Sequence, residues 1–395
     1  MDPAKRNSWL NRFAWFTALI ALLLICSGGM VTSKGAGLAV PDWPTTFGYN
    51  MFLFPVSQWV GGILFEHTHR LLASTVGLLT LLLAIWLWAR ETPGPARWLG
   101  SAAMLLGVAV LGVRTQPVDI GLGLVALLVM VFGIMRFVKS SGALRWLGLS
   151  ALGAVILQGV LGGLRVTMLK DEIGIFHACL AQAFLGLLVF VALLTTNSWQ
   201  SLPRLTVASQ RPLSLFRLAL VTALLIYLQL ALGATMRHQH RDLAILDFPT
   251  ANGAWLPDTS SQALTAINSR REAHALSDVT SLQIWLQMAH RFGALLSAIA
   301  VVTCALRIWR DAQGVQLLRS LSLWWVVLLL SQLTLGAWTI WSNKAADIAT
   351  AHVAVGALML SLGVSIAAIS WRIMRKQPGG PAAEVSSRPA QAVVT

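Results

Sequence analysis

The chain has 395 residues, of which 56% are hydrophobic and only 11% are charged, against roughly 25% charged in an ordinary soluble domain. A helix of about 20 apolar residues crosses the hydrocarbon core of a bilayer, and the chain holds many stretches of that length. This composition excludes a soluble fold, and it predicts an all-α integral membrane protein. The formal net charge of +14 is typical of basic cytoplasmic loops and does not indicate a nucleic-acid partner.

The apolar stretches predict ten membrane spans. They are Phe13–Val31, Leu64–Ala89, Trp98–Val113, Val118–Val138, Leu144–Leu164, Ile173–Thr195, Leu213–Met236, Leu282–Ile308, Leu321–Ile340 and Ile348–Ile373. When the N-terminus is placed inside, about twice as many basic residues fall in the inner segments as in the outer ones. We therefore expect a multi-pass protein of the cell inner membrane with both termini cytoplasmic. The segment 377–395 is predicted to be a disordered cytoplasmic tail.

The sequence contains an internal repeat. The segment Leu38–Gly48 aligns with Leu243–Gly253. Further matches follow in the same order: Gly28 with Gly233, His69-Arg70 with His290-Arg291, Gln158 with Gln332, Gly162 with Gly336, and His177 with His352. We therefore expect two homologous halves, an N-terminal half over 1–200 and a C-terminal half over 201–376.

The first half is longer than the second between matched positions. His69 and Gln158 are 89 residues apart, whereas His290 and Gln332 are 42 residues apart, which leaves a surplus of 47. That surplus fits an inserted pair of helices at about 94–141. The expected architecture is two four-helix bundles in a parallel repeat, related by a pseudo-two-fold axis along the membrane normal, with the inserted pair in the first bundle.

Four of the eight histidines fall inside predicted spans. His69, His177, His290 and His352 lie near the outer ends of the second and last helix of each half. Ionisable residues inside a membrane are costly and indicate function. Two histidines on separate helices suit the two axial positions of a haem iron, whereas zinc takes three or four ligands around one centre. The alternative is that they are hydrogen-bonded packing residues.

The remaining histidines carry a weaker signal. His67 points away from the face of His69, and three others are expected to be solvated in the long outer loop of the second half. These three are His238, His240 and His274.

The residues around the four histidines differ between the halves. Glu66 shares a helix face with His69, whereas the equivalent position before His290 is Gln287. A carboxyl group beside only one pair predicts different roles for the two sites. The alternative is that Glu66 forms an i,i+4 ion pair with Arg70.

Two further groups of residues suit a haem site. Arg70 and Arg291 are expected either to bind haem propionates or to extend to the lipid headgroups. Four glycines are expected either to admit a flat macrocycle or to pack helices closely. They are Gly77, Gly186, Gly293 and Gly356.

These motifs together resemble the haem A synthase family. The resemblance is carried by the run Gly28–Pro44, the motif Glu66-x-x-His69-Arg70, the run Gln158–Gly163 followed by His177, the pair His290-Arg291, and His352. It implies that His290 and His352 ligate a haem b iron, that His69 and His177 ligate the substrate iron, and that Glu66 is catalytic. Arg70 and Arg291 are cofactor-binding on the same reading.

The family oxidises the C8 methyl group of haem O to a formyl group, using O2 and electrons delivered through haem b. The product, haem A, supplies aa3-type terminal oxidases, and the haem O is expected from a haem O synthase in the same membrane. The sequence identifies neither the electron donor nor the assembly into a homo-oligomer. The methyl group is converted to the formyl group through two hydroxylations or through a carbocation stabilised by Glu66, and the sequence is compatible with both routes.

The chain departs from the family in two ways. Many members carry a cysteine pair in the first outer loop, at the position of Val40 and near Thr46, and this chain lacks it, so a thiol relay for electrons is excluded. The inserted helix pair is also unusual.

Two alternative functions are a dihaem electron-transfer protein resembling the cytochrome b561-like quinol oxidoreductases and a transporter. The first usually places its haems on opposite sides of the membrane, and the second does not explain the matched histidines.

The inserted pair makes a prediction about topology. A reporter fused after Thr115 should lie on the outer side of the membrane, and one fused after Ser140 on the inner side. Protease accessibility of the two fusions measures this, and finding both reporters on one side would contradict the insertion.

Overall fold

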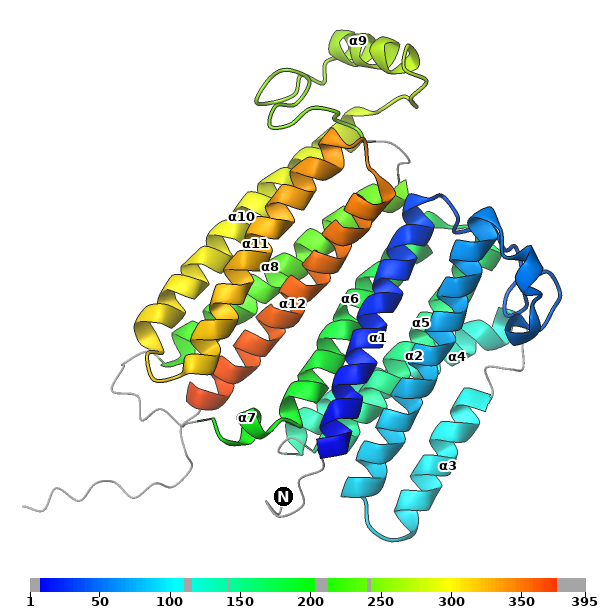
Figure 1. Ribbon diagram of the computed structural model, residues 1–395, viewed down its shortest axis with the longest axis vertical. Helices are drawn as coiled ribbons and strands as arrows, with labels where there is room; N and C mark the ends of the chain where they lie inside the picture. Colours follow the sequence, from blue (N-terminus) through cyan, green and yellow to red (C-terminus); the bar gives the residue numbers. More distant parts are fainter. Residues whose placement is uncertain (1–7, 110–115, 141–142, 203–211, 240–242, 375–395) are drawn as a thin grey trace, which may run out of the picture.

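The computed structural model describes residues 8–109, 116–140, 143–202, 212–239 and 243–374. Nine helices in these ranges are long and apolar enough to cross a membrane. They are α1 (Ser8–Ser33), α2 (Gly61–Glu91), α4 (Gln116–Lys139), α5 (Leu144–Met168), α6 (Asp171–Leu194), α8 (Pro212–Gln239), α10 (Ser281–Asp311), α11 (Gln316–Trp341) and α12 (Ala346–Met374) (Figure 1). The described ranges contain no β-sheet, only two isolated bridges. The prediction of an all-helical membrane protein is confirmed.

The third predicted span is not among these nine helices. Its helix, α3 (Pro95–Ala109), has 15 residues, which extend over about 23 Å against a hydrocarbon core of about 30 Å. The remainder of that predicted span falls in 110–115, outside the described residues, as does the predicted tail 377–395. Arg145, at the start of α5, donates hydrogen bonds to Glu91, at the end of α2. Because α3 follows α2 and α4 precedes α5, the start of α3 and the end of α4 lie at the same end of the bundle.

The helices pack as two groups of four. In the first group α1 packs on α2 and α6, and α5 packs on α2 and α6; in the second group α8 packs on α10 and α12, and α11 packs on α10 and α12. The groups meet where α1 and α6 contact α12 and α8, near the middle of the view in Figure 1. Helices α3 and α4 lie outside the first group, α3 against α2 and α4 against α5.

Glycines allow α4 to pack very closely on α5. A Cβ atom at Gly153 would lie 2.7 Å from the carbonyl oxygen of Ala126, and one at Gly133 would lie 2.6 Å from that of Trp146. Helices in lipid associate without a hydrophobic driving force, so close packing at small residues stabilises the contact between α4 and α5.

Two long loops, 34–60 and 243–280, leave the helices at the same end of the molecule, which we name the loop end (Figure 1). The first contains two short 3₁₀ turns, Met51–Leu53 and Val56–Gln58, and the second contains helix α9 (Ser261–Glu272). Helices α2, α6, α10 and α12, which carry the four histidines, all begin at the loop end.

Each loop folds around one aspartate. Asp42 accepts hydrogen bonds from the backbone N–H groups of Phe47 and Gly48 at 2.8 Å, and from the hydroxyl of Thr45. Burial alone would raise the pKa of Asp42, but these hydrogen bonds outweigh it and lower the pKa below its ordinary value.

The second loop repeats this arrangement around Asp247. Its carboxylate accepts from the N–H groups of Asn252 at 2.7 Å and Gly253 at 2.9 Å, and from the hydroxyl of Thr250 at 2.6 Å. Burial would raise the pKa of Asp247, and the hydrogen bonds again lower it.

The lowered pKa of Asp247 predicts how the second loop responds to pH. A carboxyl group whose pKa is lowered by folding stabilises the loop above its unfolded pKa, and that stability is lost as the pH falls through the folded pKa. The substitution Asp247→Asn should mimic the loss, because the amide accepts only through one oxygen. We expect hydrogen exchange of residues 243–253 to accelerate about tenfold at neutral pH, equivalent to one charge-assisted hydrogen bond. Asp278→Asn, in the exposed part of the same loop, is the control, and equal exchange in the two variants would contradict this role.

Candidate haem-binding site

All four intramembrane histidines line one cavity. The cavity has a volume of about 1450 Å³ and lies between the two groups of helices, and His69, His177, His290 and His352 form part of its wall. Sites for small molecules usually measure roughly 300–1000 Å³, so this cavity is large enough for more than one sizeable ligand. His69 lies close enough to His177 to interact with it electrostatically, and His290 lies close enough to His352.

In the first half, each histidine ring lies against a glycine of the neighbouring helix. A Cβ atom at Gly28 of α1 would lie 3.0 Å from Cε1 of His69, and one at Gly162 of α5 would lie 3.5 Å from Cε1 of His177. The Nδ1 atoms of both histidines are buried and have no hydrogen-bond partner among the described residues. Packing against the glycine backbone therefore fixes where these rings lie.

The second half repeats the arrangement. Cβ atoms at Gly233 of α8 and Gly336 of α11 would each lie 3.2 Å from Cε1 of His290 and His352, respectively. One difference is Gln229, whose amide contacts Nδ1 of His290 at 3.0 Å and donates to its carbonyl at 2.7 Å. The repeat places Leu24 at that position in the first half.

The glycines expected to admit a macrocycle are only partly at the cavity. Gly77 and Gly356 line it, and a Cβ atom at Gly77 would meet open space. Gly186 faces Val364 and Gly293 faces Gln229, so these two pack helices together. The glycines behind the histidine rings were not predicted as part of the site, although the repeat matches Gly28 with Gly233 and Gly162 with Gly336.

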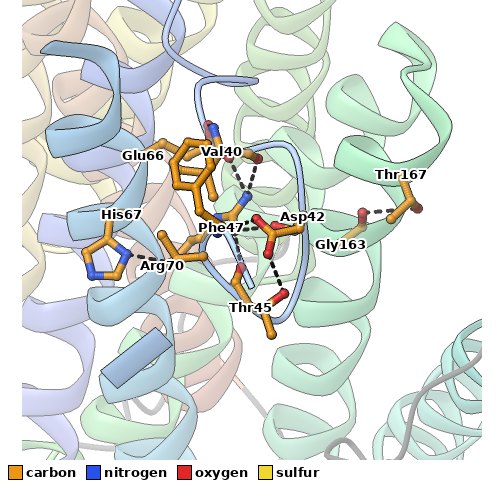
Figure 2. Close-up of polar contacts among 10 residues, drawn as sticks. Val40, Asp42, Thr45, Phe47, Glu66, His67, Arg70, Gly163 and Thr167 are labelled. Carbon is orange, nitrogen blue, oxygen red and sulfur yellow. Dashed lines mark hydrogen bonds and ion pairs between the residues drawn. The ribbon is translucent and has the colours of Figure 1, made fainter. Parts of the chain in front are cut away.

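Glu66 lies at the cavity wall and is 4% exposed. One carboxylate oxygen accepts the backbone N–H of Val40 at 2.9 Å, and the other accepts from Nη2 of Arg70 at 2.6 Å. The i,i+4 ion pair is therefore present, and Figure 2 shows both side chains directed at the first loop. Glu66 combines this contact with a position at the cavity beside His69.

Arg70 binds the first loop through backbone carbonyls. Its guanidinium donates to the carbonyl oxygens of Asp42 at 2.6 Å, Thr45 at 3.1 Å and Val40 at 2.8 Å (Figure 2). Arg291 donates in the same way to Asp247 at 2.6 Å. Both arginines line the cavity and neither extends away into solvent.

The second half replaces the carboxylate by an amide. Gln287 accepts the N–H of Ile245 at 2.9 Å and donates to its carbonyl at 3.0 Å, so one amide satisfies both backbone groups. A carboxylate can only accept, and in the first half Arg70 supplies the donor to the equivalent carbonyl, that of Val40. Glu66 and Gln287 hold equivalent loop positions, but Glu66 is ion-paired with Arg70 whereas Gln287 is uncharged.

The other histidines fall into three groups. His67 is 1% exposed and packs under the first loop, with Nδ1 3.2 Å from the hydroxyl of Thr46. His274 is exposed, as predicted, and His240 lies outside the described residues. The prediction that His238 is a solvated loop residue is wrong, because α8 extends through it and the ring is half-buried at the cavity wall. The helix runs further towards the loop end than the apolar stretch alone indicated.

Comparison with known proteins gives the family. The COX15-CtaA family, described as cytochrome oxidase assembly protein, matches residues 119–364, more than half of the chain. The chain is 26% identical over 313 residues to the heme A synthase of Shouchella clausii, covering 78% of this chain and 85% of that protein. It is 24% identical over 385 residues to the heme A synthase of Shewanella oneidensis, covering 92% and 96%. The chain therefore belongs to the COX15-CtaA family of cytochrome oxidase assembly proteins.

Proposed function

We propose that this protein is a haem A synthase, which oxidises the C8 methyl group of haem O to a formyl group with O2. The observation that carries the proposal is one cavity with two pairs of histidines and a carboxylate beside only one pair. A cavity of that volume in a haem-binding family suits two macrocycles, one as substrate and one as cofactor.

The four histidines suit axial ligation of haem iron. Three of the four rings have a buried Nδ1 without a partner among the described residues, and all four pack against a glycine and line the cavity. In the second half glutamine side chains also contact the rings, Gln229 at Nδ1 of His290 and Gln332 at Nε2 of His352. In the proposal His290 and His352 ligate a haem b, and His69 and His177 ligate the substrate haem O. Bound haem b supplies one-electron transfer.

Glu66 is the group proposed to distinguish substrate from cofactor. Its carboxylate places negative charge at the wall beside His69, where positive charge on the reacting methyl carbon would be stabilised. Gln287 offers the same shape without the charge, which suits a site that transfers electrons only. Arg70 and Arg291 hold the loops that cover the two sites, and their guanidinium groups lie at the cavity, within reach of a haem edge.

The architecture proposed for this function is a parallel repeat. Each half contributes four helices related by a pseudo-two-fold axis along the membrane normal, and helices at about 94–141 are inserted in the first half. The similar loops around Asp42 and Asp247 support this reading. We propose a location in the cell inner membrane with both termini cytoplasmic, with haem O supplied by a haem O synthase there and electrons by an unidentified donor.

The arrangement of the histidines disfavours the cytochrome b561-like alternative. All four lie within about the first three turns of helices that begin at the loop end, whereas haems on opposite sides of a membrane need ligands at both ends.

The cofactor assignment predicts the spectra of two variants. His290→Ala and His352→Ala each remove one axial ligand, so the purified protein should lose its low-spin haem b absorption and its haem A synthesis. His274→Ala, at an exposed position, is the matched control and should retain both. A normal low-spin haem b spectrum in either of the first two variants would refute the assignment.

The role of Glu66 predicts a separation between binding and turnover. In Glu66→Gln the amide oxygen still accepts the N–H of Val40, and Arg70 keeps its loop carbonyls, so both sites should remain occupied. The lost charge should lower haem A formation about a hundredfold or more, because a preorganised charge is worth several kcal/mol in a low-dielectric site. Pigment extraction should give haem O with normal haem b. If Glu66→Gln formed haem A at the wild-type rate, Glu66 would have no catalytic role and would serve only as the ion-pair partner of Arg70.

A further inference from the structure

The basic residues at the loop end of the cavity form a group that the sequence did not bring together. Arg165 comes from α5 in the first half, and Arg237 and His238 come from the end of α8 in the second half. All three line the cavity. We propose that Arg165 and His238 form an anion-binding site for a propionate carboxylate of the macrocycle held between His69 and His177. This inference rests on the proposed function.

Arg165 and His238 meet over a glycine of α6. A Cβ atom at Gly174 would lie 2.8 Å from Nδ1 of His238 and 3.1 Å from Nε of Arg165. On its other side the Arg165 guanidinium lies against Gly37 of the first loop, where a Cβ atom would be 2.9 Å from Nη2. Any side chain at either glycine would clash with the Arg165 guanidinium or the His238 ring, so the two glycines leave room for these side chains at the cavity wall.

Arg165 and His238 lie on the loop-end side of His177, the proposed ligand of the substrate haem. Gly162 packs on the ring of His177, and Arg165 follows Gly162 by three residues on the same face of α5. Gly174 likewise precedes His177 by three residues on α6. Arg165 and His238 therefore lie about one helical turn from the ligand contact, towards the loop end. The carboxylates of a haem project from one edge of the ring, and in this site that edge would face the loop end.

No carboxylate is bound directly to the Arg165 guanidinium in the part of the chain that the structure describes. Among the described residues no hydrogen bond or ion pair to the Arg165 guanidinium is found. The carboxylates that act on it electrostatically are Glu66, which is already bonded to Arg70 and Val40, and Asp171, which is exposed. A cation without a partner at the wall of a membrane cavity is unfavourable, and an anionic ligand group would remove that penalty.

Arg237 has a different role. Its guanidinium donates to the carbonyl of Gly29 and to the hydroxyl of Ser33, both on α1. These bonds fix the end of α8 to the first half and so hold the adjacent His238 over Gly174. Arg237 is thus a positioning residue.

The site serves only one of the two halves. By the offsets of the repeat, Arg165 corresponds to Thr339 and His238 corresponds to Ser33. Neither equivalent carries a positive charge, so the second half has no matching pair. The proposed binding site for haem O is completed by a residue of the other half, which makes the two halves interdependent.

The test compares two ligands in matched variants. Protein purified from cells that make no haem O is titrated with haem O and with haem O whose two carboxyl groups are methyl esters, and binding is followed by absorption. The variants are Arg165→Gln and His238→Gln, Arg165→Lys retains the charge, and Arg270→Gln on the exposed face of α9 is the control. The haem b spectrum at His290 and His352 reports whether each variant is folded.

We expect wild-type protein and the Arg270→Gln control to bind haem O at least tenfold more tightly than the diester. Arg165→Gln should remove that preference by weakening haem O binding alone, His238→Gln should reduce it, and Arg165→Lys should retain part of it. Equal affinity of the wild type for the two ligands, or an equal loss for both ligands in Arg165→Gln, would overturn the anion site while leaving the proposed function intact. Failure of the wild type to bind haem O would overturn both.

Discussion

The contact between a histidine ring and a glycine of the neighbouring helix is the constraint on which the rest of the site depends. A histidine that is to ligate iron inside a membrane needs a free ring nitrogen, and the surrounding hydrocarbon supplies no water to orient the ring. Packing must then orient it, and a glycine backbone brings the adjacent helix close enough to do so. The contact occurs four times, from Gly28 to His69, Gly162 to His177, Gly233 to His290, and Gly336 to His352. The four contacts join α1 to α2, α5 to α6, α8 to α10 and α11 to α12, and all four rings line one cavity.

The difference between the halves is electrostatic. Glu66 and Gln287 occupy equivalent places and bind equivalent loop backbones, but the carboxylate needs Arg70 to complete what the amide does alone. The first loop lacks the cysteine pair carried by many members of the family, and it is fixed by Arg70 and Asp42. Among the residues that line the cavity, the first half supplies Glu66, Arg70 and Arg165, and the second half supplies Arg237, Arg291 and Lys344 but no carboxylate.

Much of this organisation could be predicted because it is periodic or repeated. Apolar stretches of sufficient length predict helices, and repeat-matched positions predict which histidines belong together. The rest depends on distances between helices, which the sequence does not encode locally. Helix α8 continues through His238, which brings this side chain to the cavity wall. The glycines that pack against the histidine rings lie on neighbouring helices. The short α3 likewise could not be told from a full span, because apolar residues continue beyond its last described turn.

The central claim is that the two pairs of histidines hold chemically different macrocycles. The most direct measurement is a density map, by electron cryomicroscopy, of the protein purified with haem b and loaded with haem O under anaerobic conditions. The isoprenoid chain of haem O distinguishes it from haem b at side-chain resolution. We expect the macrocycle between His69 and His177 to carry this chain, with its C8 methyl group towards Glu66, and the one between His290 and His352 to lack it. An isoprenoid-bearing macrocycle between His290 and His352, or a single macrocycle in the cavity, would contradict it.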